Sequence, residues 1–272
     1  IALFLVVATS LGLFLFSSKG TNLGGLWVNG NNDGLVYDLK EKNSKLFTGY
    51  TEDNIKEVAL GKKVRQEFER SIKAVSDSKL KSIADFDKKY QFHTKEVILV
   101  KTERYGYYNL VQKDGTNVIL DIGLSEVFSH GSNTKEFKKR CLFYKAEVPK
   151  AFVGNWKKFD EDDDAEGKAT ISENGVISTD SDDTDILIAK PLREYLVNKS
   201  GKVDNDKVQK EFDKIQKSLK SHGYQAKSVN DIYHDERSSY YFAVVDGGKR
   251  IIILEDSYGD LYSGYIERQD KD

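Results

Sequence analysis

The chain opens with one uninterrupted apolar run. Residues 1–16 are almost entirely aliphatic or aromatic, and no charged side chain occurs before Lys19. A helix of this length would span roughly 25 Å, close to the hydrocarbon thickness of a bilayer. A cleaved signal peptide would end in small residues, which residues 15–18 match poorly. We therefore predict a transmembrane anchor or signal segment at 1–18. The anchor is favoured and would make a single-pass protein of the cell membrane with extracytoplasmic domains; a secreted protein is the alternative.

Beyond this run, two segments 144 residues apart follow the 3.6-residue period of amphipathic helices. The segment Lys63–Arg70 resembles Lys207–Lys214 in sequence. Each segment begins a face of four apolar side chains: Val64, Phe68, Ile72 and Val75 in the first, and Val208, Phe212, Ile215 and Leu219 in the second. This resemblance is the first sign that the chain repeats one module.

Strand-like runs and glycine turns around the helices also recur. Gly25-Leu26-Trp27 matches Gly154-Asn155-Trp156, and we expect each tryptophan to fill one end of a core. The 144-residue spacing aligns two further pairs of segments: Val97–Val100 with Tyr241–Val244, and the turn Asp114-Gly115 with Tyr258-Gly259. The order of strands, turns and helix is therefore the same in both halves.

These patterns predict an α+β chain that is mainly β. The N-terminal segment would be followed by two tandem β-barrel or curved-sheet modules, at 19–147 and 148–272, each with an inserted amphipathic helix. The boundary falls before Pro149, because the residue that precedes a proline is pushed toward extended geometry.

A family resemblance supports this architecture. Val148–Trp156, followed by Lys168–Gly175, resembles the opening of lipocalin-like domains in exported proteins of Gram-positive, lactobacillus-type bacteria. Those domains begin with a Gly-x-Trp strand and continue into a Thr-Ile-x-x-x-Gly hairpin. The resemblance implies two lipocalin-like modules, each a small antiparallel barrel or a strongly curved sheet, in the cell envelope. It implies no particular activity.

Charge and cysteine content narrow the classes of partner. The formal net charge is −2, so no global positive field attracts nucleic acid, and we predict no nucleic-acid partner. Cys141 is the only cysteine, which excludes a disulfide within the chain and a cysteine-based metal centre. Beside Leu142 and Phe143 it is expected to be a small buried hydrophobe.

An acidic stretch at 160–185 raises the question of a cation. Asp160, Asp162 and Asp164 alternate as the first ligands of a calcium loop do, but Ala165 stands where such a loop needs glycine. A polar hairpin loop is the favoured interpretation. A loose calcium site at these three aspartates is kept as a hypothesis, and no other cofactor is predicted.

Tyrosines in the late strands are the candidate binding residues. They are Tyr107, Tyr241, Tyr258, Tyr262 and Tyr265. Exposed tyrosine offers a sugar or peptide both apolar area and a polar handle, although packing within the sheet is the commoner use. Strict strand alternation places Tyr262 and Gly264 on one face and Tyr265 on the other.

Known catalytic motifs give no further direction. The sequence has no G-x-S-x-G elbow and no phosphate-binding loop, and its four histidines are scattered. We therefore predict a non-catalytic, membrane-tethered binding or scaffold protein whose ligand is a protein, a peptide or a cell-wall glycan. One alternative is an envelope hydrolase or modifying enzyme that uses His222 or His234 near the acidic stretch. Another is a structural subunit of a membrane-anchored assembly.

Overall fold

A computed structural model of the chain divides into two compact units between Ala146 and Glu147, and each unit is described by itself. The structure describes residues 23–40, 43–49, 51–75, 79–129, 133–181, 183–198, 201–235, 237–255 and 261–269. The predicted segment 1–18 and the candidate Tyr258 lie outside these residues. Among the helices that are described, none combines the length and the apolar character needed to cross a bilayer.

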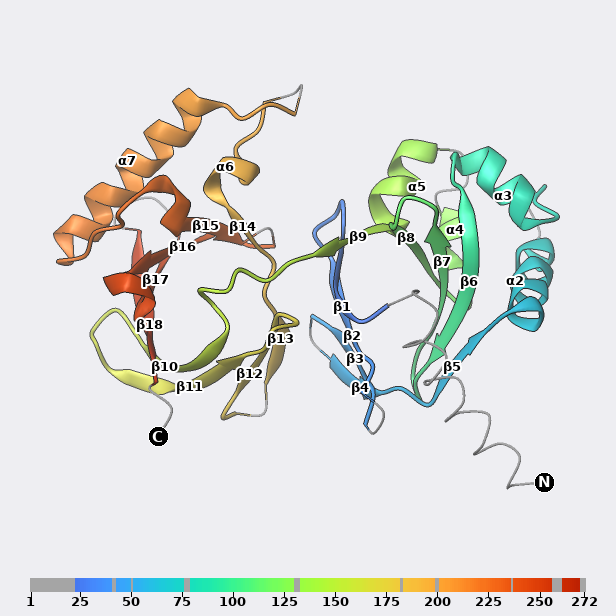
Figure 1. Cartoon of the computed structure of the whole chain (residues 1–272), viewed down its shortest axis with the longest axis horizontal. Coiled ribbons are helices and arrows are strands. Elements are labelled where there is room, and N and C mark those ends of the chain that lie inside the picture. Colours follow the sequence, from blue (N-terminus) through green and yellow to red (C-terminus); the bar gives the residue numbers. More distant parts are fainter. Residues whose placement is uncertain are drawn as a thin grey trace. The chain divides into compact units, whose positions relative to one another are not determined.

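The first unit is one antiparallel sheet of nine strands with helices on its outer side (Figure 1). The strands are β1 (Gly25–Asn29), β2 (Gly34–Asp38), β3 (Lys45–Thr48), β4 (Thr51–Asn54), β5 (Glu57–Leu60), β6 (Thr94–Lys101), β7 (Gly106–Gln112), β8 (Asn117–Asp121) and β9 (Leu142–Ala146). The helices are α2 (Lys62–Ala74), α3 (Ile83–Tyr90), α4 (Ser125–Ser129) and α5 (Thr134–Cys141). The strand order is β4-β3-β2-β1-β9-β8-β7-β6-β5.

The second unit repeats this topology. Its strands are β10 (Gly154–Phe159), β11 (Ala165–Ile171), β12 (Val176–Thr179), β13 (Thr184–Ile186), β14 (Ala189–Pro191), β15 (Ile232–Asp235), β16 (Tyr240–Val245), β17 (Arg250–Glu255) and β18 (Tyr262–Arg268). Its helices are α6 (Leu192–Tyr195), α7 (Asn205–Ser221) and the single turns η1 (Val229–Asp231) and η2 (Asp246–Gly248). The order β13-β12-β11-β10-β18-β17-β16-β15-β14 matches the first unit strand for strand. The predicted mainly β fold of two tandem modules is confirmed.

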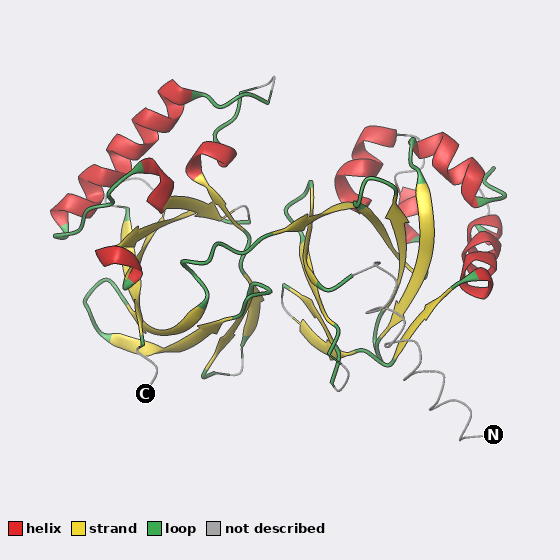
Figure 2. Ribbon diagram, viewed as in Figure 1, coloured by secondary structure: helices red, strands yellow, loops and turns green. Residues whose placement is uncertain are grey.

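Figure 2 shows that each sheet is curled and that helices lie on its outer side. Each sheet has one core inside its curl and a second core under its helices. In the first unit the inner core includes Trp27 and Tyr37, and the outer core includes Phe68 and Phe137. In the second unit Trp156 belongs to the inner core, while Ile215 and Tyr241 belong to the outer one. Alternate residues of β7 and β16 face opposite cores, as the pleat of a strand requires.

The tryptophans occupy equivalent sites at the start of each unit. Trp27 is buried, and its Nε1 donates a hydrogen bond to the carbonyl of Leu23 at 2.6 Å. Trp156 is buried and makes the same bond, to Phe152 at 2.7 Å. The prediction that these side chains fill cores is confirmed.

Opposite each tryptophan, the last strand of the unit carries a cation. Lys145 of β9 pairs with Trp27, and Arg268 of β18 pairs with Trp156, at the same place in the ladder. The Lys145 ammonium lies 6.0 Å from its ring centroid and the Arg268 guanidinium 4.4 Å from its own. The first and last strands of the two units are therefore joined in the same register.

The amphipathic helices lie where the sequence predicts them, and the eight apolar side chains of their predicted faces are buried or partly buried. After each helix the chain repeats a cap in which a serine and an aspartate bond each other. Ser82 Oγ donates to Asp85 at 2.9 Å, and Ser228 Oγ donates to Asp231 at 3.1 Å. The repeat thus extends beyond the helices themselves.

The strands after the helices correspond differently from the predicted alignment. By place in the sheet, β6 corresponds to β15 and β7 to β16, so the match of Val97–Val100 with Tyr241–Val244 is wrong by one strand. The cause is α3, which has eight residues, whereas η1 has three. The topology aligns 103–108 (E-R-Y-G-Y-Y) with 236–241 (E-R-S-S-Y-Y).

The hairpin turns shift in the same way. Asp114-Gly115 joins β7 to β8, so its counterpart is Asp246-Gly247, between β16 and β17, and the match with Tyr258-Gly259 is wrong. The first unit also inserts α4 and α5 before its last strand. Phe137 and Cys141 of α5 are buried in the outer core, as expected for the cysteine, and burial raises the pKa of its thiol.

Candidate functional site

The structure places the predicted tyrosines in two different environments. Tyr107 lies on β7 in the first unit, half-buried against the inner core. Tyr241, Tyr262 and Tyr265 share the outer core of the second unit beneath α7, where Tyr241 and Tyr265 are buried. Three of the predicted residues are thus brought together, mainly as packing, and Tyr107 is separate from them.

A β-bulge corrects the predicted alternation in β18. Ile252 pairs with Tyr265, Ile253 with Gly264 and Leu254 with Tyr262, so one residue of β18 has no opposite partner. This extra residue brings Tyr262 and Tyr265 to the same face. Gly264 allows the bulge, because its φ of 116° is rarely adopted by residues with a side chain.

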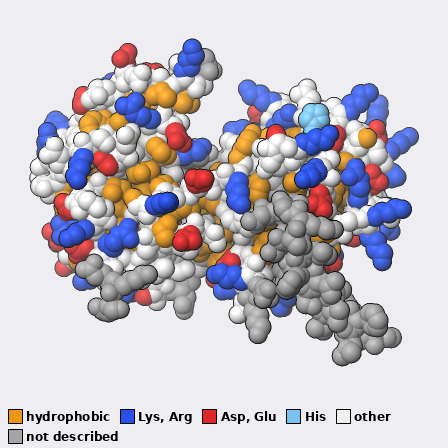
Figure 3. Space-filling model, viewed as in Figure 1, with side chains coloured by type: hydrophobic (Ala, Val, Ile, Leu, Met, Phe, Trp, Pro, Cys, Tyr) orange, Lys and Arg blue, Asp and Glu red, His pale blue; other side chains and the backbone are white. Residues whose placement is uncertain are grey.

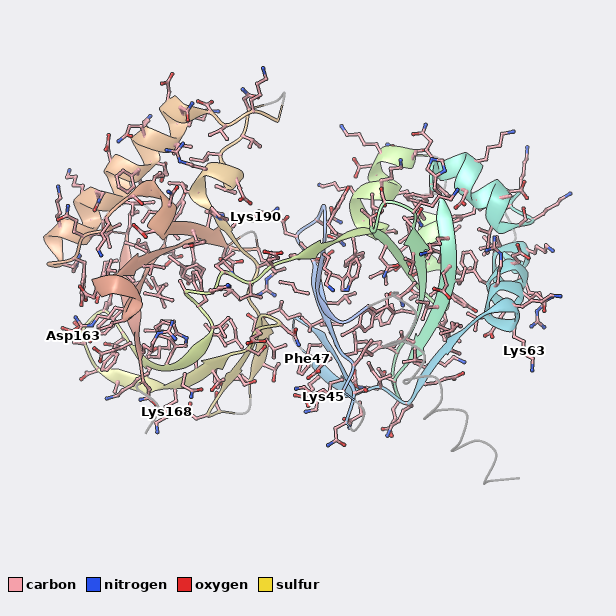
Figure 4. All side chains as sticks on the ribbon, viewed as in Figure 1. Lys45, Phe47, Lys63, Asp163, Lys168 and Lys190 are labelled. Atoms are coloured by element: carbon pink, nitrogen blue, oxygen red, sulfur yellow. The ribbon has the colours of Figure 1, made fainter. Side chains whose placement is uncertain are left out.

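The predicted calcium residues lie in the hairpin loop between β10 and β11, where Figure 4 labels Asp163. Asp160 Oδ1 accepts the backbone N–H groups of Asp162 at 3.0 Å and Asp164 at 2.8 Å. In the corresponding loop of the first unit, Asn29 Oδ1 accepts the backbone N–H groups of the residues two and four positions further on, Asn31 and Asp33. Within the described part of the chain, no three His, Cys, Asp or Glu side chains converge as a metal site. The calcium site stays a hypothesis without a supporting contact.

A pocket of about 390 Å³ at the end of β6, β7 and β8 brings Tyr107 together with residues that are not among the predicted candidates. We call it the Tyr105 pocket. Its walls include Arg104, Tyr105, Tyr107, Asp121 and Ile122. The Tyr105 and Tyr107 rings stack with centroids 6.4 Å apart. Tyr105 is 41% exposed and Ile122 46% exposed, so this pocket presents apolar side chains to solvent.

Hydrogen bonds fix the loop that carries Tyr105. Thr102 Oγ1 accepts the backbone N–H groups of Arg104 at 3.2 Å and Tyr105 at 2.9 Å. Thr102 N–H donates in turn to the Tyr105 carbonyl at 2.8 Å. Arg104 Nε donates to Asp53 of β4 at 2.9 Å, which joins this loop to the opposite edge of the sheet. The aromatic pair is therefore held in place before any ligand arrives.

Burial and neighbouring charges keep the Tyr107 hydroxyl neutral. Burial raises the pKa of Tyr107 to about 12, and Tyr105, Asp121 and Glu126 add to the shift. Burial also raises the pKa of Glu126 above its ordinary value. Tyr107 therefore remains protonated at neutral pH and can donate a hydrogen bond.

The second unit keeps the frame of this pocket without its aromatic pair. Arg237 Nη2 lies 2.9 Å from Asp185 of β13, which repeats the link between Arg104 and Asp53. Ser238, however, stands in the place of Tyr105. The signal that would have found the site from sequence is the E-R-x-x-Y-Y repeat, in which the first unit has the additional tyrosine.

The histidines of the enzyme alternative lie against tyrosines. His222 stacks on Tyr262 with ring centroids 4.2 Å apart. His234 is buried, with its ring 3.6 Å from that of Tyr195 and 4.8 Å from that of Tyr241. Neither histidine lines the Tyr105 pocket, the pocket at the hairpin between β16 and β17, or the pocket at the hairpin between β7 and β8. These contacts give the enzyme alternative no support.

Comparisons with protein-family models, with curated proteins and with solved structures found no match to this chain.

Proposed function

We propose that this chain is a non-catalytic binding protein of the cell envelope whose first unit binds a glycan in the Tyr105 pocket. The observation that carries the proposal is the stacked pair of Tyr105 and Tyr107 at an open pocket of about 390 Å³. A tyrosine ring gives the apolar face of a sugar a flat contact, and its hydroxyl provides a polar handle. The volume lies within the range of small-ligand sites.

The charges around the pocket favour a neutral ligand. Arg104 is paired with Asp53, and Lys101 lies 3.4 Å from Glu57. Glu103 lies 2.9 Å from Lys56. These three pairs compensate one another, and Asp121, the other charged side chain in the wall, accepts a hydrogen bond from Ser125 Oγ. Hydrogen bonds and ring contacts are therefore left for recognition of a ligand without negative charge. A protein partner would need a larger contact surface than this pocket provides, so a glycan is preferred over a protein or a peptide.

The proposed location comes from the sequence. The apolar run at 1–16, the lack of cysteine pairs and the lipocalin-like Gly-x-Trp strand support a protein tethered by 1–18 with its two units outside the cell. Removal of residues 1–18 should then release the protein from the membrane fraction. If the shortened chain stays with the membrane, the tether lies elsewhere.

The binding proposal is tested by calorimetry on the full chain in mild detergent, with oligomers of N-acetylglucosamine and soluble cell-wall glycan fragments as probes. Tyr105→Ala should weaken binding about five- to tenfold, since one aromatic contact contributes roughly 1 kcal/mol. Tyr144→Ala is the matched control, because Tyr144 is 53% exposed in the same unit but lies outside the pocket. No binding by the unaltered chain, or equal losses in both variants, would contradict the proposal.

A further inference from the structure

A larger pocket, of about 550 Å³, lies in the second unit at the hairpin between β16 and β17. We call it the Arg268 pocket. Three cationic side chains line it: Lys150 before β10, Lys227 after α7, and Arg268 of β18. The hairpin contributes Asp246 and two glycines, and the remaining carboxylate in the wall is Asp231. Figure 3 shows Lys and Arg spread over both units, so it is the pocket, and not the cations alone, that distinguishes this place.

Arg268 has a fixed position, and no carboxylate of the described residues lies within ion-pair distance of it. Its Nη2 donates to the carbonyl of Ala151 at 2.8 Å, its Nη1 to Val153 at 2.9 Å, and its Nε to Gly248 at 3.2 Å. All three acceptors are neutral, so the bonds orient the guanidinium without cancelling its charge. Contact with the Trp156 ring further restricts it.

The carboxylates of the pocket are engaged elsewhere, whereas its lysines are not. Asp231 accepts the N–H and hydroxyl of Ser228, and Asp246 lies 3.3 Å from Arg250. Across the residues that the structure describes, neither Lys150 nor Lys227 lies within ion-pair distance of a carboxylate. The two ammonium groups therefore remain available to an anion from solvent.

A comparison with the first unit explains why this pocket is open in the second. Its corresponding hairpin, between β7 and β8, borders a pocket of about 150 Å³. Phe92, which follows α3, and Lys138 of α5 line that smaller space, and the Lys138 ammonium lies 5.2 Å from the Phe92 ring centroid. The second unit has only η1 in the place of α3 and has no counterpart of α5 among its described elements. The reduced helical cover leaves the hairpin accessible.

We propose that the Arg268 pocket binds a phosphate group. Lysine ammonium groups bind phosphate as compact point charges, and a fixed guanidinium adds a third positive charge. The pocket volume accommodates a phosphate ester with a small organic part, which Val244 and Ala151 in the wall can contact. This site is separate from the Tyr105 pocket and does not depend on the function proposed for it.

The test is isothermal calorimetry with inorganic pyrophosphate on the full chain in mild detergent at low ionic strength. The double variant Lys150→Gln/Lys227→Gln should weaken binding at least tenfold, because each ammonium contributes a charge-assisted contact. Arg268 is left unchanged because its packing on Trp156 supports the fold. The matched control is Lys210→Gln/Lys217→Gln, which removes the same charge from exposed positions on α7 and should leave binding within twofold.

Two results would overturn the phosphate site. Equal weakening in both double variants would show non-specific attraction and would overturn the site, as would the absence of pyrophosphate binding at millimolar concentration. A parallel titration with a glycerol phosphodiester, which resembles a lipid headgroup, distinguishes the two sources of phosphate. Tighter binding of the diester than of pyrophosphate would indicate a headgroup, and weaker binding would indicate free phosphate. Tyr105→Ala should leave pyrophosphate binding unchanged, so this proposal and the glycan proposal can fail independently.

Discussion

The interiors of the two curled sheets have different chemistry although their strands correspond one to one. In the first unit three buried polar side chains bond one another. Tyr37 hydroxyl and Asn117 Nδ2 each lie 3.0 Å from Asn109 Oδ1, to which both donate. The positions that correspond by strand register in the second unit are apolar: Ile171, Phe242 and Ile251. The three positions change together, from a bonded set to an apolar set.

This difference shows what a buried polar group requires. Asn109 Oδ1 can accept two donors, so one amide serves both Tyr37 and Asn117. If only one of the three side chains became apolar, a polar atom of the remaining side chains would be buried without a hydrogen bond, and its desolvation would not be compensated. One strand topology can therefore enclose a hydrogen-bonded polar set in one unit and an apolar set in the other, although the buried Asn117 Oδ1 has no partner among the described residues.

The substitution that should destabilise a unit most removes the acceptor that Tyr37 and Asn117 share. Asn109→Leu leaves two buried donors without their acceptor and should destabilise the first unit by roughly 3 kcal/mol. Phe242→Leu, at the corresponding position of the second unit, removes only packing and should cost about 1 kcal/mol. Hydrogen exchange measured by mass spectrometry on peptides from β2 and β11 reports each unit separately.

A transplant sharpens the same comparison. Replacing the first unit's set with that of the second, as Tyr37→Ile/Asn109→Phe/Asn117→Ile, should recover most of the stability lost in Asn109→Leu. If the triple variant is less stable than the single one, the two interiors do not share one geometry.

The next effect concerns the cation opposite each tryptophan. Arg268→Ala removes three hydrogen bonds and a close ring contact, and should destabilise the second unit by about 2 kcal/mol. Lys145→Ala removes a ring contact at 6.0 Å and should cost less than about 1 kcal/mol in the first unit. Urea titrations followed by hydrogen exchange in peptides from β1 and β10 would give the loss of unfolding free energy for each variant. Equal losses in the two units would show that the three hydrogen bonds of Arg268 add no stability.

The smallest effect is a pH dependence confined to the first unit. Burial raises the pKa of Glu126 in the folded chain, so the folded state holds this proton more tightly than the unfolded state. Stability should therefore fall as the pH rises from the ordinary glutamate pKa through the higher folded value, and the loss should persist above it. Glu126→Gln should remove this slope and stabilise the first unit slightly at neutral pH. Thermal unfolding between pH 4 and 8 checks it, and an unchanged slope would contradict the assignment.

Much of the fold was predictable because periodicity records which face of an element is buried. The faces that begin at Val64 and Val208 and the two Gly-x-Trp strands identified the repeat. The strand alignment after the helices failed because α3 shortens to a turn, and a fixed spacing cannot detect a deletion. The bulge in β18 was missed because alternation assumes regular pairing, and Gly264 was the available clue.

The candidate site was less predictable than the fold. Tyr107 was identified by residue type alone, and the same criterion selected Tyr241 and Tyr265, which are buried. Tyr105 belongs to the same tyrosine cluster as Tyr107 but is not among the predicted candidates, because its role depends on exposure, stacking and a loop fixed by Thr102, none of which has a period in the sequence. The Arg268 pocket brings together four segments of the chain, around Lys150, Lys227, Asp246 and Arg268, so only the folded structure shows it.

Two copies of one fold have diverged, and the first unit presents the Tyr105 pocket where the second has Ser238 in place of Tyr105. The most direct measurement is a titration of the full chain, labelled at tyrosine, with soluble cell-wall glycan fragments and followed by NMR. We predict that the signals of Tyr105 and Tyr107 shift on binding while those of Tyr240 and Tyr241 do not. Shifts at Tyr240 and Tyr241 with none at Tyr105 would contradict the account.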